Sequence, residues 1–159
     1  MEKFQENLNT AIRSMQIADH ITYVTFPLVN EKRLLLKIFD EIYKSIINCI
    51  NAILNYEYLY KRIRLYQNNE DNLSTFLNKL AKNYSLNNEQ IKKIRNIIET
   101  NKKHKKSAME FVKKDKIVIL TDNLNTQILD INIIKEYLLL AKELIMKTNL
   151  KINNKKVYI

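Results

Sequence analysis

The chain contains no glycine and a single proline, Pro27, and this composition restricts the folds that it can adopt. Glycine provides the positive φ angles of tight hairpins, strand bulges and phosphate-binding loops. A chain without glycine is poorly suited to β-rich folds, P-loops and dinucleotide-binding motifs. Asparagine is abundant and can take some left-handed positions instead. The composition therefore predicts an all-α fold.

The longest apolar pattern covers residues 30–64 and predicts a central helix. Its polar side chains recur every three or four residues and form one narrow strip, which consists of Lys37, Glu41, Lys44, Asn48, Asn51 and Asn55. Nearly all other positions are apolar, so neighbours must cover this helix on several sides. We expect it to be the long spine of a bundle.

Other helices are predicted on both sides of this segment. Residues 2–24 carry apolar side chains at helical spacing. Pro27 is expected to end that helix, because the residue before a proline is pushed out of the α region. A short helix is predicted after Asp71 as its N-cap. Asn87 and Gln90 have the spacing of a capping box and predict the start of a fourth helix.

The C-terminal third contains one β-like run and one further helix. Residues 115–121 (DKIVILT) either pair with residues 110–113 as a hairpin or lie extended across the bundle. A lone hairpin is marginally stable unless it packs against helices. The final helix is predicted to start near Asp130. We therefore expect a bundle of about five helices with one short extended or hairpin segment near residues 110–121.

Length and composition favour a single domain at residues 1–159, with a basic tail at residues 151–159. The first residues include acids and no apolar block, so we expect no signal peptide. No apolar stretch of about 18 residues is present to span a membrane. The lone Cys49 cannot form an internal disulfide, which fits a reducing compartment. We expect a cytoplasmic protein with no membrane partner.

Metal and catalytic patterns are sparse in this sequence. His20 and His104 are the only histidines, and neither HExxH nor CxxC spacing occurs. The adjacent carboxylates Asp40 and Glu41 are not on the same face of a helix and are interpreted as surface charge. We therefore predict no metal and no cofactor, and we leave enzymatic activity open while favouring a non-enzymatic protein.

Positive charge is concentrated in residues 92–116. Residues 1–91 carry 11 Lys and Arg against 10 Asp and Glu, whereas residues 92–159 carry 16 against 7. Such a field favours a polyanion, because Lys and Arg contacts to phosphates supply most sequence-independent nucleic-acid affinity. The predicted contacts are Lys92, Arg95, Lys102, Lys103, Lys105, Lys106, Lys113, Lys114 and Lys116.

Genome composition offers a second explanation for the lysines. The many Ile, Asn, Lys and Tyr residues are typical of an A+T-rich genome, which would raise the total number of lysines without any function. Codon bias explains the total better than it explains the clustering. A merely solvated charged face therefore stays open as the alternative to a binding surface.

A second cluster mixes aromatic and basic side chains in the segment NYEYLYKRIRLYQNN. Stacking rings beside cations suit single-stranded RNA, and the available residues are Tyr58, Tyr66, Lys61, Arg62 and Arg64. The alternative is structural. Tyr56 and Tyr60 continue the apolar stripe of the central helix, and Glu57 can pair with Lys61 four positions later.

Arg13 and His20 are separated by six residues (SMQIAD). An Arg followed by a His at this spacing in a helical bundle resembles the higher-eukaryote and prokaryote nucleotide-binding (HEPN) domains. That resemblance implies a dimeric ribonuclease, or a toxin–antitoxin component, in which Arg13 and His20 are the catalytic residues. The motif lies on the first predicted helix here, whereas in the family it usually lies on a late one.

Three longer stretches carry a second resemblance. ADHITYVTFPLVNEKRLLLKI, YEYLYKRIRLY and HKKSAMEFVKKDKIVIL are similar to a group of small archaeal proteins of unassigned function. This resemblance implies a stable helical fold and gives no residue a catalytic role.

Together these observations favour a non-enzymatic basic helical protein that binds nucleic acid, most simply RNA, through phosphate contacts. Two alternatives stay open at this point. One is the HEPN-like ribonuclease or toxin–antitoxin component, and the other is a protein-interaction module or helical homodimer.

Overall fold

The protein is mainly helical with a small antiparallel sheet, as a computed structural model shows for residues 1–154. Helices account for 71% of the structure, and five of them have seven residues or more. These are α1 Lys3–His20, α3 Leu34–Leu59, α4 Asn69–Thr75, α5 Asn88–Lys105 and α6 Ile131–Asn153. The prediction of about five helices is therefore confirmed, whereas the prediction of an all-α fold is corrected to mainly helical.

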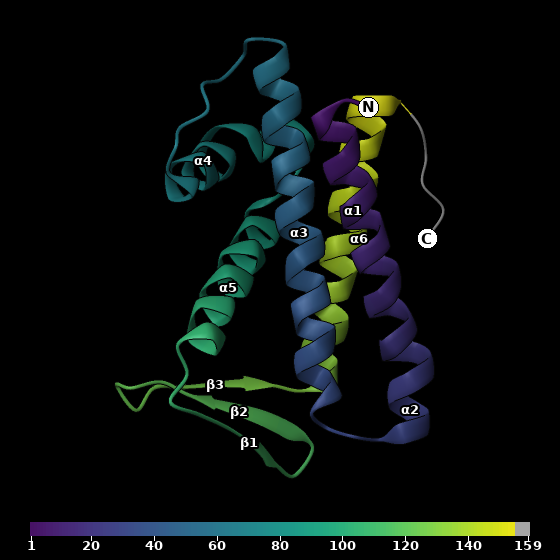
Figure 1. The fold of residues 1–159 in the computed structure, drawn as a ribbon, viewed down its shortest axis with the longest axis vertical. Helices are drawn as coiled ribbons and strands as arrows, with labels where there is room; N and C mark the ends of the chain where they lie inside the picture. Colours follow the sequence, from purple (N-terminus) through teal and green to yellow (C-terminus); the bar gives the residue numbers. More distant parts are fainter. Residues whose placement is uncertain (155–159) are drawn as a thin grey trace.

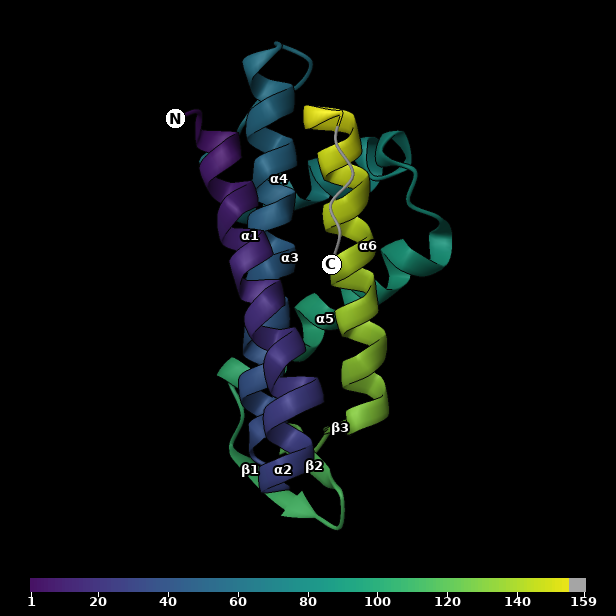
Figure 2. The same cartoon turned by 90° about the vertical axis from the view of Figure 1, so that its right-hand side faces the viewer.

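The core is built by three long helices that lie side by side. Figures 1 and 2 show α3 flanked by α1 and α6, with α4, α5 and the sheet on the opposite side of α3 from α1. Both apolar stripes of α3 are buried or half-buried, as the sequence pattern requires. The observed helix is shorter than the predicted 30–64, because a turn precedes Leu34 and the chain leaves the helix after Leu59.

The first helix does not stop before Pro27. After α1, the chain continues through a π-helical turn at Ile21–Thr25 into the short helix α2, Phe26–Val29. The proline lies in the first turn of α2, directly after the π-helical turn, so the change in hydrogen-bond pattern occurs where the chain has a residue without an N–H. The helical path ends instead at Asn30, whose φ of 55° is left-handed.

Capping side chains of asparagine set the starts of α4 and α5. The N-cap of α4 is Asn68, whose side chain accepts a hydrogen bond from the Glu70 amide, so the prediction of Asp71 as the cap is wrong. After α4 the chain continues through a π-helical turn, Phe76–Leu80, and a 3₁₀ turn, Lys82–Tyr84. The capping box of Asn87 and Gln90 is confirmed, with reciprocal hydrogen bonds of 2.8 and 3.0 Å.

The predicted hairpin is present and gains a third strand. The strands are β1 Met109–Lys113, β2 Lys116–Leu120 and β3 Thr126–Leu129, paired antiparallel in this order. Lys114 (φ 56°) and Leu124 (φ 63°) occupy left-handed turn positions that glycine usually takes. These turns therefore form although the chain has no glycine. Ile117, Ile119 and Leu129 bury the sheet against the helices.

The last helix, α6, starts as predicted at the N-cap Asp130, whose side chain accepts a hydrogen bond from the Ile133 amide. Ile134, Leu138, Ala141 and Ile145 are buried as expected. Of the predicted tail at 151–159, residues 151–153 belong to α6, and residues 155–159 lie outside the described residues. In the described part of the chain, no helix is long and apolar enough to cross a membrane.

Candidate nucleic-acid interface

The loop after α3 is set by a left-handed lysine. The Lys61 amide donates to the Tyr58 carbonyl (2.9 Å), and the Arg62 amide donates to the Glu57 carbonyl (3.0 Å). This pair of bonds is a Schellman motif, whose left-handed position usually holds glycine and here holds Lys61 at φ 59°. The motif turns residues 62–66 back toward α4.

A buried carboxylate fixes the same loop. Glu57 is only 4% exposed; its Oε2 accepts from Arg62 Nη1 (3.2 Å) and its Oε1 accepts from the Tyr84 hydroxyl (2.8 Å). Burial, then the hydrogen bond to Glu57, raises the pKa of Tyr84. The predicted pair of Glu57 with Lys61 is therefore wrong, because the left-handed turn places Arg62 at the carboxylate instead.

The far end of the loop is clipped to α4 by one side chain. Asn72 Oδ1 accepts from the Tyr66 amide (2.7 Å), and Asn72 Nδ2 donates to the Tyr66 carbonyl (2.9 Å). Half of the Tyr66 side chain is exposed. The loop thus presents Arg64 and Tyr66 from a backbone held at both ends.

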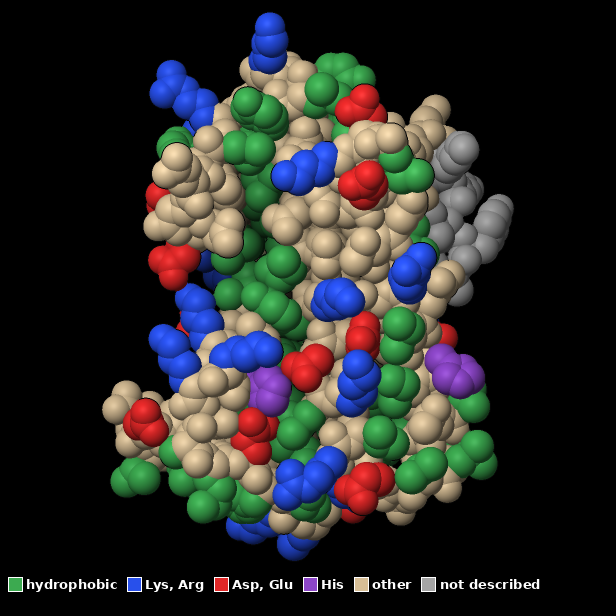
Figure 3. All heavy atoms as spheres, viewed as in Figure 1, with side chains coloured by type: hydrophobic (Ala, Val, Ile, Leu, Met, Phe, Trp, Pro, Cys, Tyr) green, Lys and Arg blue, Asp and Glu red, His purple; other side chains and the backbone are tan. Residues whose placement is uncertain are grey.

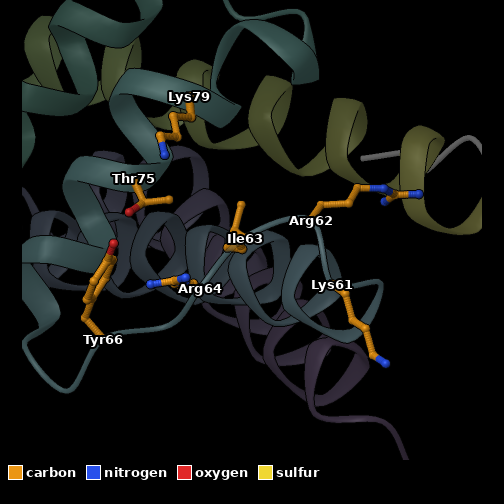
Figure 4. A pocket seen from close by; sticks show the side chains of 7 residues that line it. All are labelled: Lys61, Arg62, Ile63, Arg64, Tyr66, Thr75 and Lys79. Carbon is orange, nitrogen blue, oxygen red and sulfur yellow. The ribbon is translucent and has the colours of Figure 1, made fainter.

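A cavity of about 440 Å³ lies between this loop, α4 and the π-helical turn that follows; we call it the cationic pocket. Its lining residues are Lys61, Arg62, Ile63, Arg64, Tyr66, Thr75 and Lys79. Figure 4 shows Arg64, Tyr66, Thr75 and Lys79 gathered around the hollow, whereas Lys61 and Arg62 extend away from it. None of these lining residues is acidic.

Charge pairing separates the cations of this pocket into two kinds. Arg62 is paired with Glu57 and lies over the rings of Tyr56 and Tyr60, with 5.9 and 5.1 Å between its Cζ and the ring centroids. The charge of Arg62 is therefore largely paired within the protein. Within residues 1–154, Arg64 and Lys79 form no ion pair, so they can meet an anion.

The cationic pocket continues toward α5. A neighbouring hollow shares Tyr66, Thr75 and Lys79 with it and also includes Asn78 and the acidic Asp71. Arg95 of α5 donates to Asn78 Oδ1 over 3.4 Å. The structure thus brings Arg95 from the 92–116 segment next to the aromatic and basic cluster of residues 58–66, and it adds Lys79, which the sequence analysis missed.

The remaining cations of the 92–116 segment do not all gather there. Lys92, Arg95 and Lys102 are exposed on α5 as predicted, and so is Lys106, the C-cap of this helix. Lys105 is also exposed, while Lys103 is half-buried. Lys102 pairs with Glu99 (3.5 Å).

Three more predicted contacts lie at the sheet. Lys113, Lys114 and Lys116 surround the β1–β2 turn, whose Asp115 is 3.9 Å from Lys32. Figure 1 places this turn at the opposite end of the molecule from α4. In Figure 3, acidic side chains (red) interrupt the Lys and Arg side chains (blue) on the visible face. The 92–116 segment is therefore divided between two places.

His104 takes part in a polar cluster that sequence reasoning did not foresee. Its Nδ1 is 2.9 Å from Glu110 Oε1 in β1, and its Nε2 is 3.2 Å from Asp40 Oδ1 in α3. The single proton of Ser107 Oγ is within reach of Glu110 Oε1 (2.9 Å) and of the His104 carbonyl (3.1 Å), not of the imidazole ring. No hydroxyl is aligned for attack, so this cluster joins α3, α5 and the sheet rather than forming a nucleophilic site.

Arg13 and His20, the residues of the HEPN-like pattern, are both exposed on α1. They lie on the same side of the helix, about 10 Å apart along its axis. Neither forms a hydrogen bond or ion pair through its side chain with any residue between 1 and 154. The same part of the chain holds no group of three or more His, Cys, Asp or Glu side chains arranged to bind a metal.

Comparison with models of known protein families, with curated proteins and with solved structures gives no match to this chain. The candidate site is therefore defined by its geometry alone. It consists of Arg64, Tyr66 and Lys79, with Lys61 at the outer edge and Arg95 alongside.

Proposed function

We propose that this protein binds nucleic acid without catalysis, most simply RNA, and that the cationic pocket holds its phosphates. The observation that carries this proposal is the convergence of Arg64 and Lys79 on one hollow that has no acidic residue in its lining. The guanidinium of Arg64 can donate two parallel hydrogen bonds to a phosphate, and the ammonium of Lys79 adds a compact charge.

The walls of the pocket suit the same ligand. Tyr66 exposes half of its side chain beside these cations and offers a ring face for a base. The Thr75 hydroxyl donates to the Asp71 carbonyl (3.0 Å), so it can accept but not donate a further hydrogen bond. The lining side chains that can still donate to a phosphate are therefore the charged ones and the hydroxyl of Tyr66, and the charged ones make the expected binding dependent on salt.

The test is fluorescence anisotropy with a labelled single-stranded RNA between 50 and 200 mM salt, a range over which phosphate binding weakens by orders of magnitude for extensive contacts. If Arg64, Lys79 and Arg95 contact phosphates, the slope of log affinity on log salt should be about −2 for a single strand. Arg64→Gln and Lys79→Gln should each weaken binding and make the slope shallower by about 0.7.

The matched control is Lys44→Gln. Lys44 is exposed on α3, about 22 Å along the helix axis from Leu59. This variant loses the same charge but should keep the affinity of the wild type. An affinity that does not change with salt, or an equal loss in all three variants, would exclude the cationic pocket as the phosphate site.

A second candidate function has its own observation. Leu139, Met146 and Leu150 lie at spacings of seven and four on α6 and are 57%, 38% and 38% exposed. This apolar stripe favours a protein-interaction surface or a helical homodimer. Light scattering tests for a homodimer. A dimer that Met146→Glu dissociates would support this interaction surface, and a monomer at high concentration would count against it.

A further inference from the structure

A second cavity lies on the other side of α4 from the cationic pocket. It measures about 240 Å³ and is enclosed by α3, α4 and α5; we call it the interhelical pocket. Its apolar lining consists of Tyr43, Ile47, Ile50, Leu54, Leu73 and Ile98. Figure 3 shows hydrophobic side chains (green) along the furrow between α3 and the α4–α5 part of the molecule.

The rim of this pocket carries polar groups with no assigned partner. The side chains of Asn51, Asn69 and Glu70 line the cavity and make no hydrogen bond with any residue that the structure describes. A small apolar cavity edged by amide and carboxylate groups suits a flat ring with hydrogen-bonding edges. A single aliphatic chain would leave these groups unused.

The interhelical pocket is continuous with the phosphate site. A further hollow shares Glu70, Leu73, Ile98 and Lys102 with it and also contains Arg95. Arg95 in turn contacts Asn78, which belongs to the hollow beside the cationic pocket. A strand that passes around α4 would therefore meet Arg95 between the two pockets. Lys102 pairs there with Glu99, and Glu70 and Asp71 are the other acidic residues that line these hollows.

We propose that the interhelical pocket takes an unstacked base of a single-stranded nucleic acid whose phosphates contact Arg64, Lys79 and Arg95. This inference rests on the proposed nucleic-acid binding. Bases of a duplex are stacked and paired, so they cannot enter such a pocket, whereas bases of a single strand can be splayed out into it. The proposal therefore predicts a preference for single strands over duplexes.

The test compares one labelled RNA as a single strand and annealed to its complement. The wild type should bind the single strand about fivefold or more tightly, as expected for one good base contact. Asn51→Ala removes a rim amide and Ile47→Phe fills the cavity; both should reduce single-strand affinity and leave duplex affinity unchanged. Asn48→Ala, which removes an amide from α3 outside the pocket lining, is the matched control.

Circular dichroism of each variant checks the fold, and Asn51→Ala keeps the test valid if Ile47→Phe does not fold. Equal binding of single strand and duplex, with no effect of Asn51→Ala, overturns the base pocket and leaves the phosphate site intact. Loss of binding to both forms in a folded Asn51→Ala variant also overturns it. No binding to either form at 50 mM salt overturns the proposed function itself.

Discussion

Removing the hydroxyl of Tyr84 tests how the loop of the cationic pocket is anchored. Tyr84 is 1% exposed, and its hydroxyl is the donor to Glu57 Oε1 at 2.8 Å. Tyr84→Phe keeps the ring in place and leaves one oxygen of a buried carboxylate without its donor. An unsatisfied buried partner costs about 1–3 kcal/mol, so the free energy of unfolding should fall by about that amount.

The other partner of the carboxylate should matter less. Half of the Arg62 side chain is exposed, 53%, so water screens its pair with Glu57 and can replace it. Arg62→Gln is therefore expected to lower the free energy of unfolding only slightly. The structure thus predicts a larger loss of stability for Tyr84→Phe than for Arg62→Gln, although only the second removes a charge.

Urea denaturation followed by circular dichroism at 222 nm measures both changes. A double-mutant cycle of Tyr84→Phe with Glu57→Ala isolates the energy of their shared hydrogen bond, because each single variant removes it. A loss below about 0.5 kcal/mol for Tyr84→Phe, within the range of ordinary surface substitutions, or a larger loss for Arg62→Gln, would refute this reasoning.

Three further predictions concern the turn, the thiol and the HEPN-like pattern. Lys114→Gly should raise the free energy of unfolding by about 0.5–1 kcal/mol, because Lys114 occupies the left-handed first position of a two-residue hairpin turn. The same denaturation assay measures this change, and a decrease in the free energy of unfolding would contradict the prediction. Burial raises the pKa of Cys49 to about 12 from 9.0, so the free energy of unfolding should fall as the pH rises from 9 toward 12. A thiol reagent should label the folded protein only through unfolding, and rapid labelling at pH 8 would be inconsistent with this burial. RNA incubated with the protein should stay intact on a denaturing gel, whereas cleavage that His20→Ala abolishes would favour the ribonuclease.

Features that depend on neighbours in the sequence could be predicted well. The capping box of Asn87 and Gln90 joins residues three positions apart, and Ile94 and Ile97 follow the helical period into the core. β3 was missed because its four residues carry little pattern: Leu129 is the buried one among them, although the strand follows β2 after a short connection. The rule against turns without glycine failed at Lys114 and Leu124, since the pairing of the flanking strands holds these exposed residues in left-handed conformations that they disfavour in isolation.

The candidate site was only partly visible in the sequence. Arg64 and Tyr66 stand out in an aromatic and basic cluster, but Lys79 is a single cation in an ordinary amphipathic segment. It meets Arg64 only because the left-handed Lys61 and the clip by Asn72 turn the loop back onto α4. No local pattern encodes that approach, and composition could not distinguish Arg62, which the fold uses, from Arg64.

The hydrogen bond from Cys49 to Thr148 has a consequence for the order of events during translation. Cys49 Sγ donates to Thr148 Oγ1 over 3.3 Å, so α3 is sealed on this side by a helix that the ribosome makes 99 residues later. Until α6 has left the exit tunnel, the nascent chain holds its thiol uncovered. Cys49 is therefore a native reporter of the docking of α6. Pulse labelling of arrested chains should show that the thiol becomes protected only when α6 docks.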